Sequence, residues 1–273
     1  MQRLNQTRTI VFLTSPAIIF MLVFFIVPLF YLLSQSVQTE DAAFSAQGYA
    51  DFFSSRTSQI VYWRTLRTGA LVTLMCVVLA YPASFVIARM PPRRRSIAMS
   101  LVILPLMTNA VARTYAWLII LGRQGVVNET LLALNLTEQP LRLIFTERAV
   151  ILGLAQLFLP LMVLPLVSAM ENIPDDVIEA ARSLGANEFT AFMRTIVPLS
   201  ADGLVLGATL VFTGSVTAYV TPAILGGTRT LLLSTLLYQR AVTLADINSG
   251  AVVAVVMILT TLAVNLALRW LRR

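Results

Sequence analysis

The sequence predicts an all-α integral membrane protein with six transmembrane helices. Of its 273 residues, 58% are hydrophobic and 12% are charged, and the mean hydropathy is +0.81. Soluble domains carry roughly twice that share of charged residues. Six apolar runs are also long enough to cross a bilayer, which takes about 20 helical residues. No long polar block separates them, so we expect no additional soluble module.

The expected spans are distributed along the whole chain. They cover Ile10–Leu33, Thr68–Ala88, Ile97–Leu121, Ala149–Ala169, Gly203–Leu225 and Gly250–Trp270. The first is longer than the apolar core of a signal peptide and no clear cleavage site follows it, so we expect a retained helix. Residues 1–63 would hold this helix and an external loop, and residues 64–270 a five-helix core. Between the third and fourth spans, residues 125–134 are expected to form a short helix at the outer interface.

Arginine placement predicts the orientation. The very short loop between the second and third spans holds Arg93, Arg94 and Arg95 beside Arg89. Cytoplasmic loops carry an excess of basic residues, so this end of the spans is expected to face the cytoplasm, with both termini and the loop after the fourth span. The opposite side is not free of charge, and the bias is moderate. It holds Arg56, Arg64, Arg67, Arg123, Arg142, Arg148, Arg229 and Arg240.

The residue types that are missing exclude several activities. All 20 basic residues are arginine, and the sequence has no lysine and no histidine. A P-loop ATPase needs a lysine, and zinc proteases and Ser-His-Asp hydrolases need histidine. Cys76 is the single cysteine, so neither a disulfide within the chain nor a cysteine metal cluster can form. We expect no catalytic residue and no metal site. The net charge of +7 is interpreted as loop orientation and contact with anionic lipid rather than nucleic-acid binding.

A polar, helix-forming segment, Asp175–Pro198, interrupts the apolar pattern between the fourth and fifth spans. Asp176 and Glu179 have the spacing of a helix capping box. An apolar stripe follows at i, i+4 and i+7, formed by Val177, Ala181 and Leu184.

The segment contains a second helix signal. Gly185 suits a left-handed helix end, and Asn187 can cap another helix that is expected to end before Pro198. A helix, a sharp turn and a helix in a membrane-protein loop predict a docking surface for another protein. The alternative is an amphipathic hairpin that lies on the membrane or packs beneath its own bundle.

The residues of this loop resemble a known family motif. Glu179-Ala180-Ala181, then Gly185, and later Ile196-Val197-Pro198-Leu199, match the EAA motif of the membrane subunits of type I binding-protein-dependent ABC importers. The resemblance implies a coupling loop, about residues 171–199, that seats in a groove of an ATPase subunit. The implied coupling residues are Glu179, Ala180, Ala181, Arg182, Ser183, Leu184 and Gly185.

Other segments resemble the spermidine/putrescine branch of this family, which also includes permeases for opines and amino-acid derivatives. They include residues 104–109, residues 113–117 and residues 159–166. The resemblance implies three kinds of partner: an ATPase dimer, a second homologous permease and an external solute-binding protein. Membrane lipid is the further partner expected from composition and charge. ATP and Mg²⁺ would be bound by the ATPase and no cofactor by this chain.

Several polar residues within the expected spans are candidates for a translocation path. Arg113 would lie near the outer end of the third span, where snorkelling to the interface is the structural alternative. Hydroxyl groups in membrane helices commonly bond their own backbone or a neighbouring helix, which is the alternative for the fifth span. The candidates are Asn109, Arg113, Gln156, Thr213, Ser215, Thr217 and Tyr219.

Carboxylates lie near the ends of the expected spans and not in their centres, as Glu147 and Asp202 illustrate. A proton-coupled carrier usually needs a carboxylate relay at membrane depth, so this distribution favours a transporter driven by ATP through a partner. A secondary carrier or channel without an ATPase is the alternative. A membrane enzyme is disfavoured because the usual catalytic bases are missing.

Overall fold

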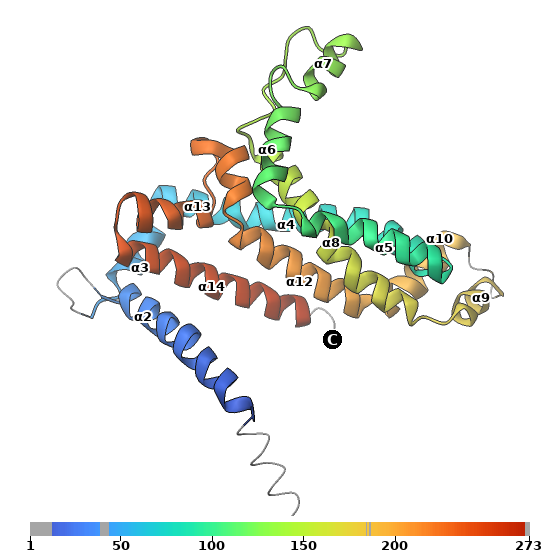
Figure 1. Ribbon diagram of the computed structural model, residues 1–273, viewed down its shortest axis with the longest axis horizontal. Helices are drawn as coiled ribbons and strands as arrows, with labels where there is room; N and C mark the ends of the chain where they lie inside the picture. The colour runs from blue at the N-terminus through green and yellow to red at the C-terminus, as the bar shows by residue number, and fades with distance from the viewer. Residues whose placement is uncertain (1–12, 39–43, 184, 186, 271–273) are drawn as a thin grey trace, which may run out of the picture. The chain divides into compact units, whose positions relative to one another are not determined.

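The computed structural model describes residues 13–38, 44–183, 185 and 187–270, and most of them are helical (Figure 1). Four helices in this part of the chain are long and apolar enough to cross a membrane: Leu13–Ser36, α4 (Arg56–Ala88), α8 (Glu147–Glu171) and α14 (Ile247–Trp270). Two sharply bent helix pairs bring the number to six if each pair counts as one span. The all-α, six-span fold class is confirmed.

The chain divides into two compact units, of which the smaller comprises residues 1–59 and 237–256. Its described elements include a π-helical turn (Leu22–Ile26), α2 (Val27–Ser36), α3 (Gln47–Ser54) and a second π-helical turn (Gln239–Thr243). Tyr49 donates a hydrogen bond to Ser36 Oγ at 2.8 Å, which links α3 to the end of α2.

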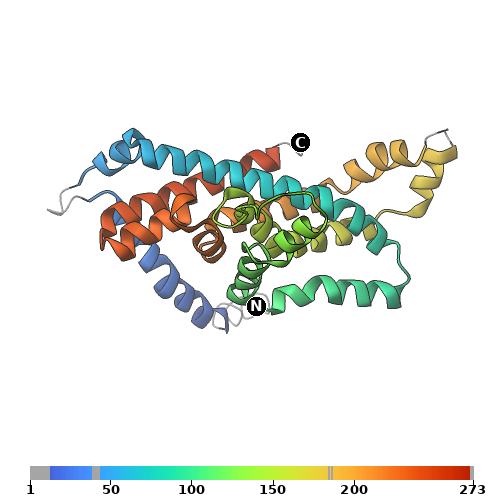
Figure 2. The same ribbon diagram turned by 90° about the horizontal axis from the view of Figure 1, so that it is seen from above.

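The larger unit, residues 60–236 and 257–273, has α8 at its centre. The helix α12 (Ala201–Thr217) runs beside α8 in both views (Figures 1 and 2). Glycines allow the close approach, because a Cβ at Gly203 would lie 2.5 Å from the Pro165 carbonyl oxygen. Small residues commonly permit such packing between membrane helices. The buried side chains of this core include Val72, Cys76, Leu154, Met162, Leu166 and Val211.

The helix α4 flanks this core and is joined to α8 by side-chain contacts with its backbone. Cys76 Sγ donates to the Ala155 carbonyl at 3.6 Å, and Ser84 Oγ donates to the Val163 carbonyl at 3.4 Å. α4 has 33 residues and is about 50 Å long at 1.5 Å per residue, so it exceeds the roughly 30 Å of a bilayer's hydrocarbon core. It begins at Arg56, well before the apolar run that predicted it.

The third expected span, Ile97–Leu121, is not one continuous helix. The chain forms α5 (Pro92–Met107) and α6 (Ala110–Ile120), and the two helices meet at 91°. The break lies at Thr108 and Asn109, both in extended conformation, and Asn109 Oδ1 accepts hydrogen bonds from the backbone N–H groups of Val111 and Ala112. This cap starts a new helix inside an apolar run, which hydropathy alone does not register.

The fifth span is also interrupted, although a helix over Gly203–Leu225 was expected. α12 ends at Thr217, Ala218 is extended, and a π-helical turn follows over Pro222–Gly226. Ser234 Oγ, at the start of α13 (Leu233–Tyr238), donates a 2.6 Å hydrogen bond to the Ala218 carbonyl. The break is therefore stabilised from a later part of the chain. A 3-10 turn, Gly227–Arg229, completes this region.

The short helix expected after the third span is present as α7 (Val126–Ala133). Asn128 fixes the loop that follows it, because its amide donates to the Gly122 and Leu141 carbonyls and accepts from the Leu141 N–H. Its depth relative to a membrane stays a prediction.

A Gly203→Val substitution should destabilise the protein, since the new side chain meets backbone and the Ala169 Cβ, 2.7 Å away. Overpacking of this kind costs about 1–3 kcal/mol. Thermal unfolding of the purified protein in detergent measures the effect. Leu206→Ala, on the exposed face of α12, is the control. Equal unfolding temperatures for the Gly203 variant and the wild type would contradict the close packing of α8 and α12.

Candidate functional site

The loop between α8 and α12 begins with α9 (Asp175–Ser183). The Val177 N–H bonds to the Pro174 carbonyl at 3.2 Å, and the helix starts two residues earlier than the capping-box spacing requires. Asp176 consequently lies in the first helical turn, not before it. Glu179 and Ala180 are exposed, and Ser183 Oγ bonds to the Glu179 carbonyl at 3.0 Å. Of the predicted coupling residues, Leu184 lies outside the described residues, as does the side chain of Arg182.

The turn after α9 has the predicted conformation. Gly185 has φ +85°, in the left-handed region where a side chain is strained. Within the described chain, no atom lies within 4 Å of a Cβ built there, so the requirement for glycine comes from the backbone and not from crowding. Asn187 Oδ1 accepts a 2.8 Å hydrogen bond from the Thr190 N–H and so caps the next helix.

The second half of the loop is continuous through Pro198, and the expectation that it ends before this proline is wrong. It comprises α10 (Glu188–Ala191), a π-helical turn (Phe192–Ile196) and α11 (Val197–Leu199). The Val197 N–H reaches back five residues to the Phe192 carbonyl. A proline inside a regular α-helix clashes with the preceding turn, and the wider π-helical turn relieves this clash.

An aromatic cluster anchors the second half of the loop on the end of α4. The Phe192 ring lies edge-on to Phe85 and to Tyr81, with ring centroids 5.2 Å and 5.9 Å apart. Tyr81 Oη shares a 3.0 Å hydrogen bond with Ser200 Oγ, at the 70° bend between α11 and α12. The Arg89 guanidinium lies 4.0 Å from the centroid of the Phe85 ring. These contacts join the loop to α4 and to the start of α12.

Sequence reasoning missed this cluster. A usable signal was present, because Tyr81, Phe85 and Arg89 recur at i, i+4 and i+8 and therefore share a face of α4.

The remainder of the loop presents apolar side chains without covering them. Phe189 is 73% exposed and Met193 46%, while Ala191 and Ile196 between and beyond them are buried. The loop thus has one face packed on the core and one open face that combines Phe189 and Met193 with the charged and small residues of α9. Exposed apolar groups rimmed by polar ones are typical of protein interaction sites.

Some of the predicted path residues lie near the two helix breaks, and a hydrogen bond connects the breaks. Thr114 Oγ1, in the first turns of α6, and Thr221 Oγ1, just after the end of α12, lie 3.1 Å apart. Arg113 precedes Thr114, and Tyr219 lies at the second break. Irregular backbone at membrane depth occurs where protein buries it or where it lines a water-filled cavity. The junction of the two breaks is therefore the candidate path region.

Arg113 is half-buried, and its Nε and Nη1 atoms are inaccessible to solvent. Neither nitrogen has a hydrogen-bond partner in the described part of the chain. A buried guanidinium requires an acceptor, so this group would be satisfied by water, solute or another subunit.

Several other predicted path residues have structural contacts instead. Asn109 caps α6, and the hydroxyls of Ser215 and Thr217 bond to carbonyls of their own helix at 2.7 and 2.8 Å. Thr213 Oγ1 accepts from Asn265 Nδ2 at 3.1 Å, which joins α12 to α14. Gln156 is half-buried on α8.

Comparison with known proteins places this architecture in a family. A family model described as "Binding-protein-dependent transport system inner membrane component" matches residues 80–273. The chain belongs to this family. It is a permease subunit of an ABC importer, as the loop motif implied.

Permeases of known systems are similar over most of the chain. The spermidine/putrescine transport system permease protein PotB of Haemophilus influenzae is 36% identical over 225 residues, which is 80% of this chain and 78% of that protein. PotB of Salmonella typhimurium is 30% identical over 263 residues, which is 94% of this chain and 91% of that protein.

Solved structures share the fold at low identity. A chain of a bacterial ABC transporter for import of the acidic polysaccharide alginate has a TM-score of 0.80 and 17% identity, covering 99% of this chain and 98% of that one. A chain of the MetNI methionine ABC transporter has a TM-score of 0.57 and 18% identity. The similarity covers 80% of this chain and 98% of that one. At these identities the similarity establishes the fold.

Replacing Thr114 by Val should lower the stability of the permease, since it removes the hydroxyl contact between the two breaks. Such bonds between membrane helices contribute about 0.6 kcal/mol on average. Thr217→Val is a matched control, because the Thr217 hydroxyl bonds to its own helix. Unfolding in detergent compares the two variants. If Thr217→Val lowered the stability as much as Thr114→Val, a specific link between the two helix breaks would be contradicted.

Proposed function

We propose that this permease subunit carries a polyamine, or a related amine, opine or amino-acid derivative, across the inner membrane by alternating access. The polyamine class is supported by the names of the relatives that are 30–36% identical over most of the chain. A secondary carrier or channel without an ATPase is the alternative, and membership of the binding-protein-dependent family argues against it.

The observation that carries the proposal is the two-faced loop between α8 and α12. Glu179, Ala180 and Phe189 are exposed, whereas Phe192 packs on aromatic side chains of α4. In the proposed mechanism the open face seats in a groove of the ATPase. The packed face then transmits ATPase closure to α4 and α12. The coupling contact would comprise Glu179, Ala180, Ala181, Arg182, Ser183, Leu184 and Gly185, with Phe189 as an additional apolar anchor.

The subunit would act without catalytic residues of its own. The proposed partners are an ATPase dimer that binds ATP and Mg²⁺, a second homologous permease and a solute-binding protein. A solved relative in fold is a bacterial alginate ABC transporter in complex with an alginate-bound periplasmic protein, which supports the last of these.

The solute would pass the junction of the two helix breaks, near Arg113 and Tyr219. The arginine makes this region unfavourable for an unaccompanied polycation. Selection of an amine would accordingly depend on the binding protein and the second permease. Arg113 would be paired there by a carboxylate of the solute or of the other permease.

Uptake of radiolabelled putrescine and spermidine by cells with and without the gene tests the substrate class. We expect uptake to fall when the gene is deleted and to return with the wild-type copy. Unchanged uptake of both amines, with loss of an opine or amino-acid derivative, would move the assignment to that class.

Reporter fusions test the proposed orientation, in which both termini and the α8–α12 loop are cytoplasmic. A fusion after Arg95 should report the cytoplasm, because of the arginine cluster in that short loop, and one after Asn135 should report the outside. The reverse pattern would place the coupling loop on the wrong side of the membrane.

Gly185→Val should weaken ATPase binding and abolish uptake while the protein remains in the membrane. A β-branched residue at φ +85° costs on the order of 1–2 kcal/mol, and the second loop helix would be misdirected. Co-purification of the ATPase and uptake assays measure both effects. Gly185→Asn is the matched control, since asparagine tolerates left-handed conformations better than other residues with side chains. Normal transport by the valine variant would show that the turn is not required for coupling.

A further inference from the structure

A pocket of about 580 Å³ lies between α4, the start of α8 and the segment that precedes α8. It is remote in sequence from the coupling loop and from the two helix breaks. Its polar lining includes Arg67 of α4, Arg142 of the preceding segment, and Glu147 and Arg148 of α8. Leucine and isoleucine side chains form most of the remainder, so the pocket has a charged part and an apolar part.

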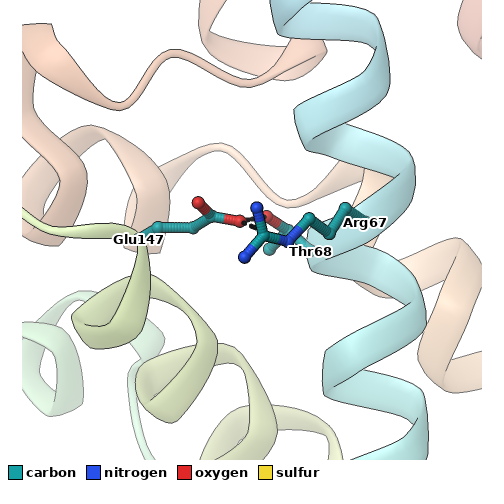
Figure 3. A network of polar contacts seen from close by, with 3 residues as sticks. All are labelled: Arg67, Thr68 and Glu147. Atoms are coloured by element: carbon teal, nitrogen blue, oxygen red, sulfur yellow. Dashed lines mark hydrogen bonds and ion pairs between the residues drawn. The ribbon is translucent and has the colours of Figure 1, made fainter.

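The charged part is cationic overall, with three arginines and one carboxylate. Glu147 Oε1 lies 3.7 Å from Arg67 Nε and accepts a 3.5 Å hydrogen bond from Thr68 Oγ1 (Figure 3). The carboxylate is thus engaged on the α4 side. Arg142 and Arg148 are exposed and have no carboxylate partner within the described chain. Two guanidinium groups therefore remain available to an anion.

The position of these charges along the helices defines their level relative to a membrane. Arg67 comes directly before the apolar run Thr68–Ala88, and Arg148 directly before the run Ala149–Ala169. Both spans consequently change from charged to apolar at the pocket, which is the level of lipid headgroups. One turn further into the spans, Leu71 and Leu152 line the same pocket and are 37% and 36% exposed. The lining thus changes from charged to apolar in the direction of the hydrocarbon level.

We propose that this pocket binds the headgroup of an anionic phospholipid. Its phosphate lies between Arg142 and Arg148, and an acyl chain follows Leu71 and Leu152. Guanidinium groups bind phosphate oxygens through paired hydrogen bonds. The excess positive charge selects an anionic headgroup over a zwitterionic one. The contact between Arg67 and Glu147 positions the rim and leaves the other two arginines to the lipid. The bound lipid would hold the segment before α8 against α4.

Lipid retention by the full chain in its transporter complex tests this site. The complex is purified from nanodiscs of phosphatidylcholine with phosphatidylglycerol, and bound lipid is counted by native mass spectrometry. We expect selective retention of phosphatidylglycerol by the wild type. An Arg142→Gln/Arg148→Gln double variant should bind it about 25-fold more weakly, since each basic residue near an anionic surface contributes about fivefold.

Two further variants separate the site from charge and folding effects. Arg123→Gln/Arg229→Gln removes the same charge from two arginines outside the pocket lining and should retain the lipid. Arg142→Lys/Arg148→Lys keeps the charge and should retain most of the phosphatidylglycerol binding of the wild type. This variant keeps the test valid if the glutamine variant folds poorly.

Three outcomes would overturn the proposal. The first is equal retention of phosphatidylglycerol by the glutamine variant and the wild type. The second is equally tight binding of millimolar inorganic phosphate in phosphatidylcholine alone, which would indicate a free-anion site. The third is a glutamine variant that loses docking of the binding protein while its lipid retention is unchanged. This result would indicate that the two arginines contact an acidic protein surface.

Discussion

Every backbone N–H and C=O group within the hydrocarbon core of a membrane needs a hydrogen-bond partner inside the protein, and this requirement governs where the helices of this permease can break. Each described break meets it with a nearby side chain. Asn109 Oδ1 caps the start of α6, Ser234 Oγ bonds to the Ala218 carbonyl, and Ser200 Oγ bonds to the Ile196 carbonyl. These contacts allow two apolar spans to change direction without exposing backbone to lipid. They also explain why polar side chains cluster at the breaks.

The same breaks link the loop to the candidate path. Ser200 lies between the coupling loop and α12, and its contact with Tyr81 connects the loop to α4. At the other end of α12, Thr221 meets Thr114 of α6. In the proposed mechanism, α12 would transmit displacement as a rigid element from the ATPase side to the candidate path, because such contacts hold it at both ends, and Gly203 would fix its distance from α8.

The sequence was sufficient to predict the number of spans, the helix–turn–helix loop, the left-handed Gly185 and the cap at Asn187, because each depends on local patterning. It was insufficient for the bends. Residues 97–121 are almost uniformly apolar, and hydropathy records composition and not direction.

Continuity of the helix through Pro198 was missed because a π-helical turn is not encoded by a known local signal. The roles of Ser215 and Thr217 could not be predicted either, since a hydroxyl can line a path or bond its own helix equally well. The family's coupling residues stay predictions. The spacing of Tyr81 and Phe85 indicates a shared face of α4, but the contact of this face with Phe192 became evident only from the packing.

The central claim is that the open face of the loop, from α9 to Phe189, contacts the ATPase while α7 does not. Cysteine crosslinking measures this directly, because Cys76 is buried and can be replaced by alanine to leave a cysteine-free background. A cysteine introduced by Ala180→Cys should crosslink through a short bismaleimide to a cysteine placed on the permease-facing surface of the ATPase, and one introduced by Val126→Cys on the exposed surface of α7 should not. Crosslinking from position 126, with none from position 180 in an assembled and active complex, would contradict the account.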